Sequence, residues 1–298
     1  MKKFESIGLY VSAIKNNKFN EQHTGFDNEE FHGKLFFVSK TCICCYEKNK
    51  NVLFVSDNSI TPKCATYTRE LKKQLTANFN CTVIHIPQWY CSDTRSHKFT
   101  LKDIINAFTE CFNELKNKRD IYTKKTAEHL LKELTAVSNS IYKVPEKLLQ
   151  DYKNLCAELT ETVKTQIEEV NEFINSHDYY EIVKEAYFTK NINTTYKTAL
   201  REYLNPTGEY AFLLINFENK NVISSETICG ASKIVMSLED ATRLSYAIQN
   251  GTVKHGQKYG NYVVMKVTNN YVQIGCNKYS MEMLNAFHEQ VVNSVHLV

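Results

Sequence analysis

The chain of 298 residues is about twice the length of a common single domain, so it is expected to form two or three structural units. A composition that is 43% hydrophobic and 23% charged excludes both a wholly disordered chain and a membrane-embedded one, and the net charge of +3 is too small to identify a polyanionic partner. Ten cysteines accompany only nine glycines and four prolines, which argues against a turn-rich sandwich or a glycine-built phosphate loop.

The N-terminal part, residues 1–98, predicts a small α+β domain. An amphipathic helix is expected in the first sixteen residues, because its apolar residues recur at helical spacing. A polar connection then leads to a meander of three strands. These strands are expected at residues 34–38, 41–46 and 52–56.

A second helix and a fourth strand complete this predicted domain. Thr61-Pro62 is a typical helix start, because threonine caps free amide groups and proline has the φ of a first helical turn. The apolar run at residues 81–87 predicts the strand, which ends at a proline that cannot donate a ladder hydrogen bond. The stripe that the helix is expected to bury consists of Cys64, Tyr67, Leu71 and Leu75.

The middle of the chain, residues 99–205, has the apolar pattern of long helices. Apolar residues stand mostly three or four apart from Leu101 to Leu115, and the pattern resumes from Leu130 to Ile141. After an interruption at Pro145 it continues from Leu148 to Ile174. A proline between two long amphipathic segments predicts an antiparallel helical hairpin. Two shorter helices are expected at residues 179–188 and 194–204.

The C-terminal part, residues 206–298, predicts a second α+β domain. Its expected strands include the apolar run at 209–215 and a β-hairpin formed by 262–267 and 271–276, and a last helix is expected from 281 to 295. Further short strands are expected at 222–223, 227–229 and 233–236, and a helix from Ser237 to Gly251. The fold class is therefore α+β, with two small α+β modules flanking a long antiparallel helical hairpin.

Short motifs stand near the start at Gly33–Phe36, Asn51–Val55 and Thr61–Leu75, and near the end at Ser237–Gly251, Gly260–Val264 and Val272–Asn277. Together they resemble the two ends of uncharacterised proteins encoded by bacterial viruses. In those proteins a histidine often stands where this chain has Asn277. The resemblance implies a phage or other viral origin and no activity.

The chain is expected to stay in the cytoplasm, which is the host cytoplasm if the protein is viral. Its longest apolar run, Tyr210–Ile215, is far too short to cross a bilayer, so no membrane partner is expected. The N-terminus lacks the apolar core and cleavage site of a signal peptide. Thiols are kept reduced in the cytoplasm, so buried free cysteines are favoured over disulfides.

The cysteines leave two chemical alternatives open. Cys42 and Cys45 have the spacing of a zinc knuckle, but Cys42 and Cys44 should point to one face of a strand and Cys45 to the other. Cys91 near His97 is the best candidate for a nucleophilic pair. Buried thiols are the favoured interpretation, with no metal, no cofactor and no catalytic residue expected.

Common enzyme signatures are absent from the sequence. It contains no phosphate-binding loop of the Walker type, no Gly-x-Gly-x-x-Gly, no His-Glu-x-x-His and no Gly-x-Ser-x-Gly. Paired acidic residues such as Glu168 and Glu169 are expected on solvated helix faces. The sequence therefore favours a non-enzymatic protein.

The distribution of charge points to nucleic acid more than its sum does. Residues 57–126 carry twelve Lys and Arg against seven Asp and Glu, and tryptophan and tyrosine lie among these cations. Cations neutralise phosphates and aromatic rings stack on unpaired bases, so this combination suits single-stranded DNA or RNA. The candidate contact residues are Lys63, Arg69, Lys72, Lys73, Trp89, Tyr90, Arg95, Lys98, Lys116, Lys118 and Arg119.

Two function classes follow from these patterns. The leading hypothesis is a nucleic-acid-binding or regulatory protein that uses this basic and aromatic segment. In the alternative, Trp89 only anchors the first domain on the helices, and the stripe from Leu148 to Ile174 contacts another copy or a host protein, so that the chain acts by self-assembly or protein interaction. An inhibitor of host defence is a third class that the sequence does not separate from these.

Overall fold

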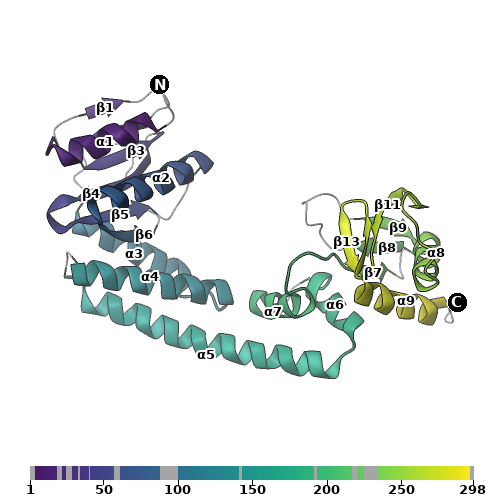
Figure 1. The fold of residues 1–298 in the computed structure, drawn as a ribbon. Helices are drawn as coiled ribbons and strands as arrows, with labels where there is room; N and C mark the ends of the chain where they lie inside the picture. The colour runs from purple at the N-terminus through teal and green to yellow at the C-terminus, as the bar shows by residue number, and fades with distance from the viewer. Residues whose placement is uncertain are drawn as a thin grey trace. The chain divides into compact units, whose positions relative to one another are not determined.

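The structure divides into two compact units, Met1–Glu161 and Thr162–Val298, and the division falls within one long helix (Figure 1). Residues 99–161 of the predicted helical region belong to the first unit and residues 162–205 to the second. The computed structural model describes residues 4–18, 22–24, 29–32, 34–39, 41–56, 61–87, 100–140, 143–190, 193–216, 221–224 and 234–295.

The first unit is built on a six-stranded sheet whose strands lie in chain order. Each neighbouring pair is antiparallel except β5 and β6, which run parallel because helix α2 (Pro62–Phe79) connects them as a crossover. The predicted strands of the meander and the fourth strand are confirmed. The strands are β1 (Gln22–Thr24), β2 (Glu29–His32), β3 (Leu35–Val38), β4 (Thr41–Glu47), β5 (Val52–Ser56) and β6 (Thr82–Ile86), with a short 3₁₀ turn at Lys48–Lys50.

Helices cover both faces of this sheet (Figure 1). Helix α1 (Glu5–Lys15) and α2 pack on the face that carries Phe36, Leu53 and Val55. Helices α3 (Leu101–Leu115) and α4 (Ile121–Ser140) pack on the opposite face. The stripe of α2 predicted from the sequence is the stripe that the structure buries, and Thr61 caps the helix by accepting a hydrogen bond from the Cys64 N–H at 3.1 Å.

The predicted helical hairpin is formed by α4 and α5 (Glu146–Ser176). The segment before it is a separate helix, α3, because residues 116–120 supply no apolar side chain and Asp120 caps a new helix by accepting from the Thr123 N–H at 2.8 Å. Leu148, Tyr152, Leu155 and Leu159 of the α5 stripe are buried in the core of the first unit, whereas Ile167 is 38% exposed.

One prediction about the cysteines is wrong. Cys42 and Cys45 lie on the α3–α4 face of the sheet, whereas Cys44 lies on the α1–α2 face. The cause is a β-bulge: Phe36 pairs with Cys44 and Phe37 pairs with Cys42, so Ile43 is an extra residue in β4. The extra residue shifts the alternation by one, and every side chain beyond it changes face.

The polar connection expected at residues 16–28 contains a strand, which is also a correction. Strands β1 and β2 form an antiparallel hairpin at the edge of the sheet. The signal in β2 is weak because only Phe31, which is 2% exposed, contributes an apolar side chain to the core. Such short strands lack the alternation by which a strand is recognised in a sequence.

The second unit contains two antiparallel sheets and the helices that pack with them. The predicted helices α6 (Tyr179–Tyr187) and α7 (Thr194–Leu204) are confirmed. The first sheet is β7 (Leu213–Asn216), β8 (Asn221–Ser224) and β9 (Val235–Ser237), and the second is β10 (Lys258–Tyr259), β11 (Tyr262–Val267), β12 (Tyr271–Ile274) and β13 (Asn277–Ser280). Helix α8 (Leu238–Gln249) precedes the second sheet and α9 (Met281–Val295) follows it.

The local signals of the C-terminal region are largely confirmed. Ser237 caps α8 by accepting from the Asp240 N–H at 3.1 Å, and Gly251 follows the helix with a φ of +63°. The β-hairpin of β11 and β12 is present, and the last helix begins and ends where it was predicted. The strand expected at 209–215 begins only at Leu213, and the strand expected at 227–229 lies outside the described residues. Among the helices that the structure describes, each is too short or too polar to cross a membrane.

Candidate functional site

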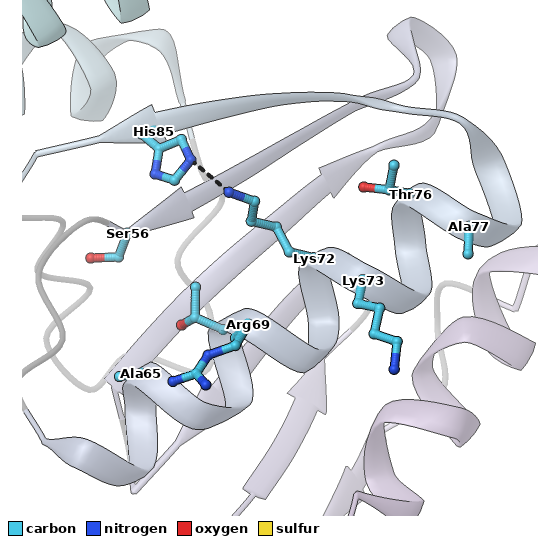
Figure 2. Close-up of a pocket in the computed structure, with 9 residues that line it drawn as sticks. Ser56, Ala65, Arg69, Lys72, Lys73, Thr76, Ala77 and His85 are labelled. Carbon is cyan, nitrogen blue, oxygen red and sulfur yellow. Dashed lines mark hydrogen bonds between the residues drawn. The ribbon is translucent and has the colours of Figure 1, made fainter.

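A solvent-accessible groove of about 690 Å³ lies beside α2 in the first unit, and Figure 2 shows the side chains that line it. The groove is bounded by one side of α2 and by the ends of β5 and β6. Three of its side chains are cations that the sequence identifies as candidate contacts. The lining residues are Ser56, Ala65, Thr68, Arg69, Lys72, Lys73, Thr76, Ala77 and His85.

The helical period places the cations on this side of α2. Cys64, Tyr67, Leu71 and Leu75 turn the apolar stripe toward the sheet, so the residues one and two positions later in each turn lie along its flank. Strand alternation places His85, because Ile84 and Ile86 point into the core under α3 and α4 and the residue between them points the other way, toward α2. Among the described strands β6 forms the edge of the sheet, so no further described strand closes this flank.

Among the residues that the structure describes, the cations of the groove have no acidic partner. Arg69 and Lys73 are exposed and Lys72 is partly buried, and within the described part of the chain no carboxylate forms an ion pair with any of them. The Lys72 ammonium lies 3.2 Å from Nε2 of His85 (Figure 2). An ammonium has donors only, so Nε2 is the acceptor of this hydrogen bond.

Helix α4 fixes the His85 wall of the groove from behind. The His85 backbone N–H donates to the Glu133 carboxylate at 2.8 Å, and Glu133 is only 7% exposed. The ring of His129 lies edge-on to the ring of His85, with a centroid distance of 5.9 Å, and its Nδ1 is 3.9 Å from Glu133. The edge strand is therefore held by a buried carboxylate that satisfies its outward N–H group.

The other predicted basic contacts that the structure describes, Lys63, Lys116, Lys118 and Arg119, are not among the residues that line the groove. Lys63 approaches Glu29 at 4.0 Å and lies over the ring of Tyr67. Lys116, Lys118 and Arg119 follow α3, which is in the helical layer on the opposite face of the sheet from α2.

Arg119 has a structural role in that layer. Its guanidinium pairs with Glu158 of α5 at 2.7 Å and donates to the carbonyls of Lys116 and Lys118 at 2.6 and 2.9 Å. Four remaining candidates, Trp89, Tyr90, Arg95 and Lys98, lie outside the described residues, as do Cys91 and His97.

His85, Ser56, Thr68 and Thr76 are groove residues that the sequence interpretation missed. The available signal was the β–α–β order itself, because parallel strands joined by a helix place their carboxyl ends together, and ligands commonly bind there. Ser56 ends β5, and His85 is the penultimate residue of β6. A polar residue between two buried isoleucines in that strand therefore marked the wall of a site.

The cysteines that the structure describes are mostly core residues. Burial raises the pKa of the Cys44 thiol to about 12, which keeps it protonated and unreactive. Cys276 is exposed, and Cys156 is partly buried. Within the described ranges, no three His, Cys, Asp or Glu side chains gather closely enough to hold a metal ion.

Comparisons with known proteins do not add to this picture. No protein-family model matches the chain, and neither the curated proteins nor the solved structures give a match.

Proposed function

We propose that this protein binds single-stranded nucleic acid and that the phosphates lie in the groove between α2 and β6. The observation that carries the proposal is the convergence of Arg69, Lys72 and Lys73 on one pocket without a carboxylate ion-pair partner among the described residues. Cations that carboxylates do not neutralise attract a polyanion and exchange its condensed counterions for direct contacts.

The groove also offers neutral donors beside the cations. The hydroxyl groups of Ser56, Thr68 and Thr76 line it, and hydroxyl side chains commonly donate to phosphate oxygens. Ala65 and Ala77 mark the two ends of the lining on α2, and the helical rise places them about 18 Å apart. That length accommodates roughly five nucleotides of a stacked strand, at about 3.4 Å each.

The shape of the groove favours a single strand over a duplex. Proteins commonly read a duplex with a helix or strand that protrudes into one of its grooves, whereas this site is a hollow on the flank of a helix that is packed on a sheet. A flexible strand follows such a hollow with its backbone. Trp89 and Tyr90, close after β6 in the sequence, stay the predicted residues for stacking on bases.

The proposal describes a binding protein, with the viral origin and the host cytoplasm that the sequence suggests. It is tested by titrating the full chain into a fluorescently labelled 20-nucleotide strand at several salt concentrations and measuring anisotropy. We expect binding that weakens steeply as salt rises, and a weaker response to a duplex of the same length. Absent binding, or an affinity that salt does not change, would refute the proposal.

A further inference from the structure

The second unit carries a cluster of Tyr271, Lys266 and Lys278 on the sheet β10–β13, with the ring of Tyr210 beside it. Val264, Val272, Ile274 and Tyr279 of this sheet belong to the core, so the alternate residues point to its other face. Gln273 pairs in register with Lys266 of β11 and with Lys278 of β13, so these three residues form a row across three strands on that face.

Tyr271 lies on the same face, two residues before Gln273 and diagonal to both lysines. The Lys278 ammonium is 5.3 Å from the centre of the Tyr271 ring, and the Lys266 ammonium is 5.8 Å from it. The ring of Tyr210 lies at a centroid distance of 6.5 Å. The cluster therefore consists of Tyr271 and two cations that come from strands on either side of it, with Tyr210 beside them.

The lysines of this cluster are not neutralised by an ion pair in the described part of the chain. Lys266 is exposed, and Tyr271 and Lys278 are partly exposed, so solvent reaches the cluster. Next to Lys266, Met265 stands at a bulge of β11 and is 49% exposed, which extends the accessible apolar surface. The Tyr271 ring can stack on a base, and the two lysine ammoniums beside it can contact the phosphates on either side of that base.

We infer that this face of the second unit is a base-stacking site for single-stranded nucleic acid, in which a base stacks on Tyr271 and adjacent phosphates contact Lys266 and Lys278. The inference rests on the proposed function for its ligand class and differs from it in site and in chemistry. The groove beside α2 recognises the backbone, whereas this face recognises the presence of bases. In the cation–π contacts both ammoniums lie over the Tyr271 ring, so they are within reach of the phosphates of a base that takes their place on it.

The test compares two probes of equal length with the full chain: a 12-nucleotide DNA strand and the same strand without bases. Stacking contributes about 1 to 3 kcal/mol per base, so Tyr271→Leu should weaken binding of the normal strand at least about fivefold and leave the abasic strand unchanged. Tyr271→Phe should restore the preference for bases, because it keeps the ring. Tyr246→Leu is the matched control, since it removes another exposed tyrosine of the same unit, 43% exposed on α8.

A second measurement guards against a loss of folding in Tyr271→Leu. A strand with 2-aminopurine in place of one base should lose fluorescence on binding to the wild type, and this quenching should be reduced in Lys266→Gln/Lys278→Gln, which leaves the ring in place. The inference would be overturned by two results together. The lysine variant would quench 2-aminopurine as strongly as the wild type does, and Tyr271→Leu would still prefer the normal strand over the abasic strand as strongly as the wild type does. A wild type that binds both strands equally, or a polyglutamate peptide that competes for the Tyr271 site as well as the strand does, would also overturn the inference.

The two proposals fail separately in this experiment. Arg69→Gln/Lys73→Gln should weaken the binding of the normal strand and of the abasic strand by the same factor, because it removes contacts to the nucleic-acid backbone only. If that variant binds normally while Tyr271→Leu loses the base preference, the groove is wrong and the stacking site stands. If the groove variant loses affinity and Tyr271→Leu does not, the stacking site is wrong.

Discussion

Removal of two groove cations should change both the affinity for a single strand and its salt dependence. Arg69 and Lys73 are both exposed on α2, so the double variant Arg69→Gln/Lys73→Gln should fold normally. For a single strand, each neutralised phosphate contributes about 0.7 to the slope of log affinity against log salt. The double variant should therefore lower the magnitude of this slope by about 1.4.

The change in this salt slope also determines the expected loss of affinity. The counterion contribution vanishes near 1 M salt, and 0.1 M salt is one decade below that reference. Over this decade a slope change of about 1.4 makes the variant bind about 25-fold more weakly than the wild type at 0.1 M salt. The assay is anisotropy of the labelled strand at five salt concentrations from 0.05 to about 0.4 M, a range over which phosphate contacts strongly change affinity.

A matched control distinguishes the effect of where the removed cations lie from the effect of the lower net charge. Lys116→Gln/Lys118→Gln removes the same formal charge from exposed residues after α3, in the helical layer on the opposite face of the sheet. Screening at 0.1 M salt acts over about 10 Å, so this variant should change affinity by less than about twofold. Equal losses in the two double variants would show that binding follows net charge, and the assignment to the groove would be refuted.

Three further predictions concern stability, each measured by urea unfolding. Glu133→Leu removes the acceptor of the His85 N–H and should lower the free energy of unfolding by about 1 to 3 kcal/mol. Glu133→Gln keeps a carbonyl acceptor and should lower it less; equal losses would contradict the role of Glu133 as a hydrogen-bond acceptor. Tyr152→Phe removes the hydrogen bond to the Phe108 carbonyl at 2.8 Å and should cost about 1 kcal/mol; a neutral result would mean that the bond adds nothing. Burial raises the pKa of the Cys44 thiol from 9.0 to about 12, so the unfolded chain loses this proton at a lower pH than the folded chain does. The free energy of unfolding should therefore fall above pH 9, by up to about 1.4 kcal/mol per pH unit, and it should fall less in Cys44→Ala.

Local signals were sufficient to predict most elements of the fold. The Thr61-Pro62 start and the four-residue stripe located α2 with its buried face, because capping and helical period depend only on neighbouring residues. Pro145 likewise located the turn between α4 and α5. These features need no knowledge of which element lies beside which.

The features that the sequence did not reveal depend on pairing between distant residues. The bulge at Ile43 exists only relative to β3, so alternation within β4 alone assigned the cysteines to the wrong faces. The contact between Lys72 and His85 requires that β6 returns parallel to β5, and the bond from His85 to Glu133 joins residues 48 positions apart. The strand residues of the candidate site, Ser56 and His85, therefore depended on topology, although its cations were recognisable from composition.

The bond from the β6 edge to Glu133 also bears on which pieces of this chain can exist alone. The sheet and α2 end before residue 98, where the sequence suggested a domain boundary, yet α4 supplies the carboxylate that satisfies the outermost strand. A fragment that stops before α4 would keep all six strands and the groove cations but would expose an unpaired strand edge and the apolar face that carries Ile84 and Ile86. Such an edge recruits other chains, so the helical hairpin also protects the sheet from pairing with a strand of another chain.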